Sequence, residues 1–277
     1  MPELPEVETV ARDLRRAGVE GCRIRAAAVF WPRIVTGLAP DEFARRIRGR
    51  RILAIGRRAK YLVFLLPGDL TLLVHLRMTG RFILAAAPGE RGPHDHVVLS
   101  LDDGRELRFH DSRKFGRWVL TSTPERILGR LGPEPLDKAF GAEAFADRTV
   151  AHRRQLKPLL LDQAFIAGVG NIYADEALWE ARLHPQRLAN TLSRNEAREL
   201  YRAVRRVLRR GIANRGTSLG MGRANFYGAN GRRGANQNGL RVFRRTGQPC
   251  PRCGAPIRRL IVGQRSTHVC TDCQKRP

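Results

Sequence analysis

The chain has 277 residues, with 51 Lys and Arg against 26 Asp and Glu, which leaves a formal net charge of +25. Because this excess is spread along the whole chain, the folded body is expected to be a polycation that binds phosphate-rich partners. The sequence argues against a membrane protein, since no apolar run approaches the about 18 residues of a spanning helix. We expect a soluble, cytoplasmic protein with two domains and a small additional module.

The first element in chain order is a predicted helix at the amino terminus. Its apolar residues fall at helical spacing: Val7, Val10, Ala11 and Leu14. Pro5 stands at the opening of this helix, and Glu6 and Glu8 lie in its first turn. The pattern predicts an amphipathic helix entered through Pro5.

The rest of the amino-terminal half is predicted to be β. Short apolar runs are separated by turn clusters such as Pro67-Gly68-Asp69 and Asp102-Asp103-Gly104. The runs are Tyr61–Leu66, Thr71–Leu76, Val97–Leu101 and Leu107–Phe109. They indicate a sandwich or barrel that ends near Leu120.

The second half is predicted to be helical. A capping box, Ser193-x-x-Glu196, precedes an apolar stripe on one face of a long helix. The other face carries Arg198, Arg202, Arg205, Arg206, Arg209 and Arg210. These arginines either bind DNA or form an ordinary solvated face, and the sequence leaves both interpretations open.

Two glycine-containing segments flank this helical region. Gly168-Val169-Gly170-Asn171 precedes a predicted helix through Trp179, and its backbone N–H groups could approach a phosphate. Residues 215–238 are rich in Gly, Asn and Arg without periodicity, as expected for a mobile loop.

Four cysteines near the carboxyl end form two pairs, Cys250-x-x-Cys253 and Cys270-x-x-Cys273, separated by sixteen residues. This spacing is typical of a zinc ribbon with one tetrahedral, structural Zn²⁺. Two disulfides are the alternative, but they would require an oxidising compartment and would leave Cys22 unpaired.

The amino terminus also has potential chemistry. Removal of Met1 would expose the secondary amine of Pro2 beside Glu3 and Glu6. A free α-amino group has a pKa near ~8, so part of it is neutral and nucleophilic at physiological pH. Prolines and glutamates are also ordinary helix openers, so this pattern alone does not establish catalysis.

Several motifs, together with the cysteine ribbon, resemble bacterial formamidopyrimidine-DNA glycosylases, which repair 8-oxoguanine. They occur in the family's order over nearly the whole chain. The motifs are Pro2–Thr9, Arg58–Leu62, His75–Gly80, His94–Val97, Asp111–Gly116, Gly132–Leu136 and Gly168–Ala174.

The resemblance implies a bifunctional DNA glycosylase and AP lyase for oxidised purines, namely 8-oxoguanine and formamidopyrimidines. Pro2 would attack C1′ and form an iminium that undergoes β,δ-elimination. Glu3 would protonate the opening sugar, and Glu6 would position the amine or its water. Lys60 matches a proton-transfer and phosphate-binding lysine, and Arg265 matches the zinc-finger arginine assigned to δ-elimination.

The resemblance also assigns DNA-binding residues. Met78, Arg113 and Phe115 match the trio that fills the gap left by the flipped lesion. Four further positions match residues that contact the DNA backbone: His94, Arg153, Lys157 and Asn171. The expected partner is double-stranded DNA containing an oxidised purine, bound by a monomer in the cytoplasm at the nucleoid.

The fold implied is α+β. Residues 1–130 would form a catalytic β-sandwich with the amino-terminal helix, and residues 131–145 a linker. Residues 146–240 would form a helix-two-turn-helix domain with a loop over the flipped base, and residues 241–277 a zinc finger with a β-hairpin.

One segment departs from the family pattern and two other functions compete. After Gly231-Arg232-Arg233-Gly234 the family usually has an aromatic pair and then Val-Tyr-Gly-Arg, whereas this chain has Ala235-Asn236 and later Val242-Phe243-Arg244-Arg245, so base recognition is not carried over. An endonuclease VIII-like glycosylase for oxidised pyrimidines is one alternative, although Leu4 stands where that group usually has glycine. A non-catalytic zinc-ribbon protein would explain the charge and the cysteines but not Pro2 beside Glu3.

Overall fold

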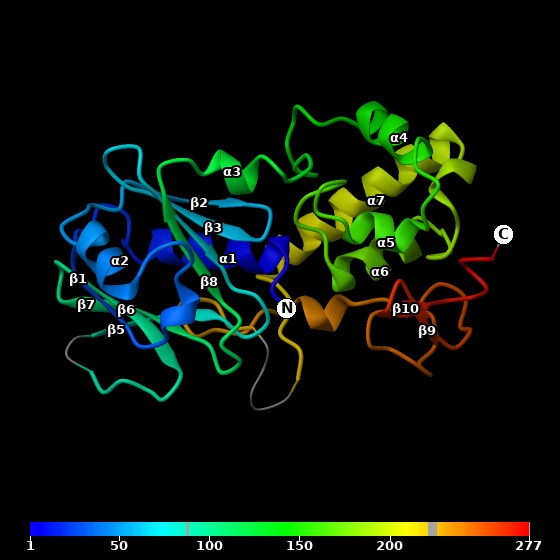
Figure 1. The fold of residues 1–277 in the computed structure, drawn as a ribbon. Coiled ribbons are helices and arrows are strands. Elements are labelled where there is room, and N and C mark those ends of the chain that lie inside the picture. Colours follow the sequence, from blue (N-terminus) through cyan, green and yellow to red (C-terminus); the bar gives the residue numbers. More distant parts are fainter. Residues whose placement is uncertain (87–88, 221–225, 277) are drawn as a thin grey trace. The chain divides into compact units, whose positions relative to one another are not determined.

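The computed structural model describes residues 1–86, 89–220 and 226–276 (Figure 1). The chain divides into two compact units. The N-terminal unit comprises Met1–Gly129 and Ile212–Gln237, and the C-terminal unit comprises Arg130–Gly211 and Asn238–Pro277.

Two antiparallel four-stranded sheets form the N-terminal unit. In sheet order, the first contains β1 (Ile24–Val29), β6 (Asp95–Leu101), β7 (Arg105–His110) and β5 (Arg81–Ala86). The second contains β2 (Ala54–Arg58), β3 (Tyr61–Leu65), β4 (Thr71–His75) and β8 (Arg117–Thr121). The predicted β-sandwich, with its last strand ending near residue 120, is confirmed.

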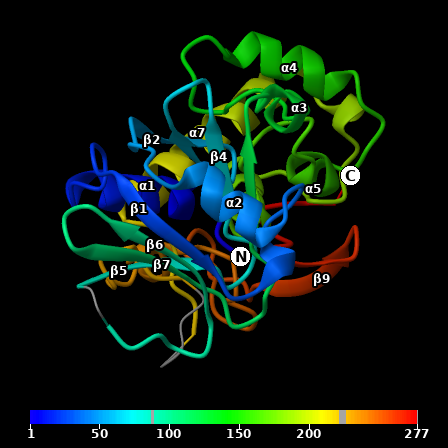
Figure 2. The same ribbon diagram turned by 60° about the vertical axis from the view of Figure 1, so that its left-hand side comes forward.

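The same part of the chain forms four helices, and all but the last of them contribute buried side chains to the core of the sandwich. They are α1 (Leu4–Arg16), η1 (Pro32–Ile34), α2 (Pro40–Ile47) and α3 (Glu125–Leu128). The predicted apolar face of α1 is fully buried, and the helix packs against β2 and β3. Helix α2 packs along β1 (Figure 2). Apolar side chains of both sheets and both helices form one continuous core.

The segment Ile212–Gln237 returns to the N-terminal unit. Phe226 and Ala229 join its core, and Arg215 Nη2 lies 2.8 Å from Asp13 Oδ1 on α1. The described residues from 215 to 235 form neither helix nor strand, as expected for a loop, and they pack on the N-terminal unit. Isolated apolar residues anchor this segment, while residues 221–225 lie outside the described ranges.

The C-terminal unit is mainly helical. Its helices are α4 (Ala142–Val150), α5 (Leu156–Leu161), α6 (Asn171–Glu180), η2 (Ala189–Thr191) and most of α7 (Arg194–Ala213); η3 (Asn236–Gly239) spans the boundary between the units. A hairpin of β9 (Arg258–Val262) and β10 (Arg265–Val269) follows. Helix α4 begins at Ala142, inside the stretch predicted as linker.

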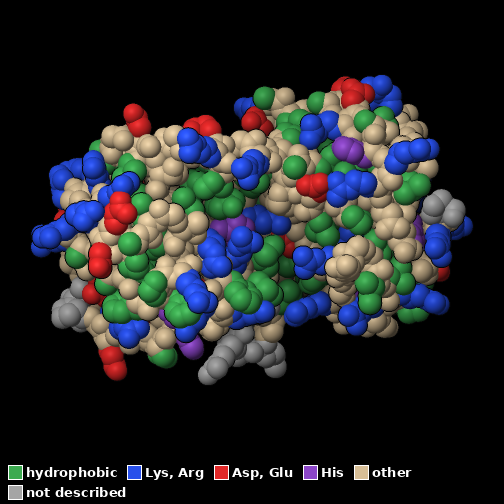
Figure 3. All heavy atoms as spheres, viewed as in Figure 1, with side chains coloured by type: hydrophobic (Ala, Val, Ile, Leu, Met, Phe, Trp, Pro, Cys, Tyr) green, Lys and Arg blue, Asp and Glu red, His purple; other side chains and the backbone are tan. Residues whose placement is uncertain are grey.

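Surface charge follows the composition. Lys and Arg side chains are spread over the face seen in Figure 3. Within the described residues, no helix has both the length and the apolar character that a membrane span requires.

Candidate active site and metal centre

The amino terminus is buried and hydrogen-bonded. Pro2 and Glu3 are buried, and Glu3 caps the start of α1. The backbone N–H of Glu3 donates to Glu6 Oε2 at 2.8 Å, and the N–H of Thr217 donates to Glu6 Oε1 at 2.7 Å. The Glu6 carboxylate therefore holds the first residues of the chain against the segment 212–237. Met1 still occupies the Pro2 nitrogen in a peptide bond, so the amine exists only once Met1 is removed.

Lys60 lies in the two-residue turn between β2 and β3. The preceding Ala59 has φ +53°, and Lys60 itself is buried. On β4, burial together with the positive charges of Arg77 and Lys60 lowers the pKa of His75 to about 3. His75 is thus neutral, and its Nδ1 accepts the N–H of Arg77 at 3.0 Å. The site thus places Lys60 near an imidazole that does not titrate near neutral pH.

Two loops of the N-terminal unit carry the predicted intercalating residues. The Met78 loop (residues 76–80) joins β4 to β5, and the Phe115 loop (residues 111–116) joins β7 to β8. The side chains of Met78 and Phe115 are 38% and 43% exposed. The Arg113 guanidinium lies over the Phe115 ring, 4.8 Å from its centroid. Apolar side chains held in solvent in this way are available to a partner.

His94 lies beside two other histidines. Its ring stands edge-on to those of His96 and His110, with centroids 6.4 and 5.5 Å away. His96 Nε2 lies 2.9 Å from the Asp111 carbonyl oxygen, and burial lowers the pKa of His96. His110 and His96 thus have structural partners, whereas His94 is half-buried and reaches the surface.

Of the predicted DNA-binding residues in the C-terminal unit, Arg153 is exposed and Lys157 is wholly buried. Lys157 Nζ lies 2.6 Å from Asp175 Oδ1 and donates to Ser266 O and Thr267 Oγ1, both at 2.8 Å. Two N–H groups of the ammonium are thus donated within the protein, and its charge is paired with that of Asp175. The phosphate contact expected for Lys157 stays a prediction, and the side chain is buried among these partners.

Buried polar contacts position the β9–β10 hairpin. Gly263 and Gln264 have φ +54° and +60°, the conformation of a tight hairpin turn, and the exposed Arg265 follows this turn. Asn171 Nδ2 donates to Ser266 O at 3.0 Å, and the His268 N–H donates to Asp175 Oδ2 at 2.9 Å. Lys157 and Asn171 meet at Ser266, the residue next to Arg265.

The acidic pair on α6 is a feature that the sequence analysis missed. Glu176 is buried and accepts the N–H groups of Arg241, Val242 and Phe243 at 2.9–3.0 Å. Burial raises the pKa of Glu176 despite these hydrogen bonds. The signal in the sequence was two consecutive carboxylates, Asp175 and Glu176, in an otherwise apolar helix.

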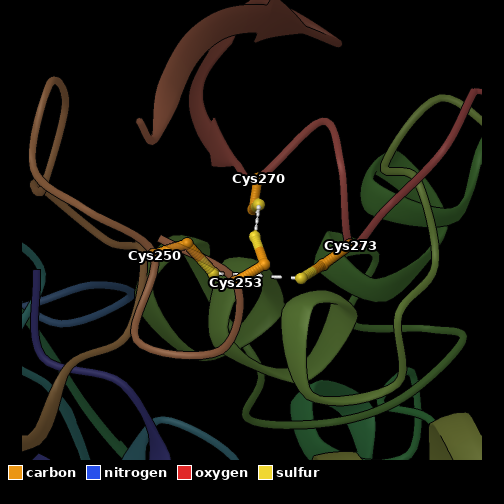
Figure 4. A group of neighbouring side chains, drawn as sticks. All are labelled: Cys250, Cys253, Cys270 and Cys273. Carbon is orange, nitrogen blue, oxygen red and sulfur yellow. Dashed lines mark hydrogen bonds between the residues drawn. The ribbon is translucent and has the colours of Figure 1, made fainter. Parts of the chain in front are cut away.

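The four ribbon cysteines converge (Figure 4). Their Sγ atoms all lie within 4.8 Å of one another, with Cys250 and Cys273 at 3.9 Å and Cys253 and Cys270 at 3.4 Å. Four thiolates at about 2.3 Å from one tetrahedral zinc would be about 3.8 Å apart. All five cysteines are free, which excludes the disulfide alternative, and the cluster fits one structural Zn²⁺.

Hydrogen bonds favour the thiolate of Cys250, whereas burial raises the pKa of Cys273 and raises that of Cys270 to about 12. Although burial raises it, the pKa of Cys250 is lowered to about 6, because the Arg252 N–H and the Trp179 indole donate to the sulfur. Gly254 has φ +80°, and its N–H donates to the Cys250 carbonyl at 2.9 Å. This local turn is the knuckle geometry that points two thiolates toward one ion.

Family comparisons cover most of the chain. Residues 1–118 match the Formamidopyrimidine-DNA glycosylase N-terminal domain, and residues 131–222 match the Formamidopyrimidine-DNA glycosylase H2TH domain. Residues 247–276 match the zinc finger found in FPG and IleRS.

Individual relatives extend the same similarity to full length. The chain is 48% identical to Formamidopyrimidine-DNA glycosylase of Protochlamydia amoebophila, with 100% of each protein covered. It is 51% identical to that of Herpetosiphon aurantiacus, covering 99% of this chain and 100% of the relative. A structure of the Lactococcus lactis Fpg in complex with an abasic site containing DNA is 36% identical, with a TM-score of 0.90 and coverage of 99% of this chain and 100% of that one.

Proposed function

We infer the reaction from one premise, that the chain belongs to the formamidopyrimidine-DNA glycosylase family. It is a DNA glycosylase and AP lyase that removes oxidised purines from double-stranded DNA. The observation that carries our account of its mechanism is the amino terminus, where buried Pro2 adjoins the Glu3–Glu6 pair.

We propose that Pro2 is the nucleophile after Met1 is removed. Its neutral nitrogen forms a bond to C1′ of the damaged nucleotide, the glycosidic bond breaks with its electrons leaving on the base, and the proton that the nitrogen then loses neutralises the departing base. Glu3 donates a proton to the ring oxygen, so the sugar opens and an iminium forms at C1′. Glu6, whose two oxygens hold Glu3 and Thr217, positions the amine rather than moving freely.

The iminium then acts as an electron sink for strand cleavage. Loss of a C2′ proton expels the 3′ phosphate by β-elimination, and a second elimination expels the 5′ phosphate. We assign Lys60 to proton transfer and phosphate binding, and Arg265 to the second elimination. The low pKa of His75 supports this assignment, because this imidazole does not take up a proton near neutral pH and so does not compete for the proton-transfer role.

Binding roles divide by surface position. Met78, Arg113 and Phe115 would fill the gap that the flipped nucleotide leaves, with Arg113 facing the orphaned cytosine. His94, Arg153 and Asn171 would contact the DNA backbone. For Lys157 we propose an indirect role, in which its ammonium fixes Ser266 and thereby places Arg265.

One Zn²⁺ held by the ribbon cysteines supplies a structural crosslink when bound. We further propose that residues 1–130 form the catalytic part, 131–145 the linker, 146–240 the helix-two-turn-helix part and 241–277 the finger. Action as a monomer in the cytoplasm, at the nucleoid, belongs to the same proposal.

Borohydride trapping tests the proposed nucleophile. Mature protein and a form that retains Met1 are each incubated with a duplex bearing 8-oxoguanine opposite cytosine, and the iminium is reduced to a stable amine. We expect a protein–DNA crosslink at Pro2 in the mature form only, while both forms bind DNA. Full lyase activity with Met1 in place would contradict the assignment.

The same assay addresses the competing functions. A non-catalytic DNA-binding protein would bind the duplex but yield no crosslink. An endonuclease VIII-like enzyme would crosslink faster to a duplex with an oxidised pyrimidine than to one with 8-oxoguanine, which is the opposite of what we expect.

A further inference from the structure

We propose that Thr79 and Asp111 form a latch that couples the Met78 loop to the Phe115 loop, so that Met78, Arg113 and Phe115 enter the DNA as one unit. Both latch residues are positioning residues that act through their neighbours. The inference rests on the intercalating role proposed above for the three side chains.

The Asp111 carboxylate anchors the Phe115 loop by hydrogen bonds to its backbone. It is fully buried, and Oδ2 accepts the N–H of Gly116 at 2.7 Å while Oδ1 accepts the N–H of Arg113 at 3.2 Å. The Asp111 carbonyl also accepts the N–H of Lys114 at 3.2 Å. A single residue thus holds the backbone on both sides of Phe115.

The same carboxylate reaches the other loop through a hydroxyl. Thr79 Oγ1 donates to Asp111 Oδ1 and lies 3.3 Å from the N–H of Arg113, whose hydrogen bond it accepts. Thr79 directly follows Met78, and the N–H of Gly80 closes this loop on the Leu76 carbonyl at 3.0 Å. One hydroxyl is therefore bonded to a carboxylate and a backbone amide of the neighbouring loop.

The two loops also rest on one aromatic ring. A Cβ at Gly80 or at Gly116 would lie 2.6 Å from ring atoms of Phe109, closer than real contacts allow. Phe109 is itself fully buried against Phe82 and Trp118. Both loop backbones contact the same buried Phe109 ring. A shift of either loop toward the core would therefore move this ring, on which the other loop also packs.

Backbone conformation supports the need for such a latch. Arg77 and Lys114, the residues just before Met78 and Phe115, have φ +53° and +58°. Non-glycine residues rarely adopt this conformation, and it persists where surrounding contacts impose it. Met78 and Phe115 thus each follow a residue in a strained conformation, and the Asp111 carboxylate helps to hold both turns.

The coupling has a functional consequence. Intercalation requires a base step to unstack, which costs free energy. This cost is the same whether one side chain enters or several. If the loops were independent, each would lose its own freedom on insertion. A prior connection through Asp111 removes part of that loss, so the preference for a lesion-bearing duplex should depend on the link.

Thr79→Val tests the latch, because valine keeps the shape of threonine and removes only the hydroxyl. We expect an about tenfold loss of preference for lesion-bearing over plain duplex, the order expected for one hydrogen bond to a charged group. Affinity for plain duplex should change little, and Thr79→Ser should restore the preference. Asp111→Asn, which disturbs both loops, should lose more.

A double-mutant cycle separates coupling from simple stabilisation. Met78→Ala and Phe115→Ala are measured singly and together, in the parent and in Thr79→Val. We expect non-additive losses of lesion preference in the parent and additive losses in Thr79→Val. Additive losses in both backgrounds, or a valine effect that only follows the thermal unfolding midpoint, would overturn the latch.

The same measurements distinguish this inference from its premise. If Met78→Ala and Phe115→Ala leave the lesion preference of the parent unchanged, the intercalating role fails. If they reduce it while Thr79→Val has no effect, the intercalating role stands and only the latch is rejected.

Discussion

The N-terminal unit and the zinc hairpin hold their reactive residues by different forces. The N-terminal unit has a continuous apolar core in which aromatic rings meet edge to face: Phe43, Phe82, Phe109 and Trp118. The hairpin rests on a small cluster: Trp179, Val242, Cys250, Ile257 and Cys270. Two of these five side chains are metal ligands.

This difference explains how each of the proposed catalytic residues is kept in place. Pro2 directly precedes the N-cap of α1, whose apolar face contributes to the large core, so hydrophobic burial of this helix holds the start of the chain in place. Arg265 lies on a hairpin with little apolar surface to bury, so the metal and the buried contacts of Lys157, Asp175 and Asn171 must do so.

Replacing a zinc ligand should have the largest effect and should be confined to the hairpin. Structural zinc sites contribute about 10 kcal/mol to folding, more than this small cluster can replace. In Cys253→Ser we expect loss of zinc by elemental analysis and loss of hydrogen-exchange protection in residues 247–276. Binding to damaged and plain duplex should weaken alike.

The matched control is Cys22→Ser, which removes the one cysteine outside the cluster and should retain zinc. Loss of hydrogen-exchange protection in the strands of the N-terminal unit in Cys253→Ser would contradict this prediction, because the zinc site would then stabilise both regions.

Breaking the buried ion pair should have the next largest effect. In Lys157→Met the carboxylate of Asp175 stays buried without its cation, a change that typically destabilises by about 3–5 kcal/mol. We expect a lower thermal unfolding midpoint of the C-terminal unit and slower δ-elimination, because Ser266 and Arg265 lose their anchor.

Arg154→Ala serves as its control. Arg154 pairs with Asp162 at 2.6 Å, but their side chains are 46% and 32% exposed, so loss of this pair should cost less than about 1 kcal/mol. Equal destabilisation by the two substitutions would show that the buried ion pair of Lys157 contributes no more to the free energy of unfolding than an exposed pair.

Local pattern in the sequence was enough to predict much of this molecule. Short apolar runs separated by turn clusters predicted the sandwich, and helical spacing predicted α1 and α7. The cysteine spacing predicted the four-thiolate cluster. Each of these signals lies within a short stretch of chain, so its physical cause is visible in the residues themselves.

Features that depend on distant partners could not be predicted. From the sequence Lys157 was predicted to contact phosphate, and only the folded structure shows it buried against Asp175 and Ser266. The Thr79–Asp111 contact joins residues 32 positions apart. Phe226 is an isolated apolar residue in a polar segment, and only its burial in the N-terminal core shows that the segment is anchored there.

A buried histidine should make the N-terminal unit sensitive to acid. The pKa of His75 is about 3 in the folded protein against an ordinary 6.5, so between these values only the unfolded chain binds the proton. The free energy of unfolding therefore falls as pH drops below about 6.5, by about 2 kcal/mol at pH 5.

Denaturant titrations of wild type and His75→Gln at pH 7 and pH 5 measure this contribution. Burial also lowers the pKa of His96 and His110, but both remain in the variant, so the difference between the proteins isolates His75. We expect the loss of stability between the two pH values to be smaller in His75→Gln. An unchanged loss would mean that His75 is not desolvated in solution.

The smallest effect is expected on the arginine face of α7. Arg202 pairs with Glu199 one turn away, and both side chains are more than half exposed. Arg198 and Arg206 likewise meet the carboxylates of Glu143 and Glu180. These contacts favour the solvated interpretation of this face, so Arg202→Ala should change the free energy of unfolding by less than about 0.5 kcal/mol.

Measuring DNA binding across a salt series tests whether the arginine face of α7 contacts DNA. Each phosphate that loses its cationic partner lowers the log–log salt slope by about 0.9. Arg202→Ala should leave the slope for plain duplex unchanged, while exposed Arg153→Ala should reduce it by about one such step. An equal reduction in both variants would place α7 on the DNA and would make the C-terminal unit a broader binding surface than its hairpin and Arg153 alone.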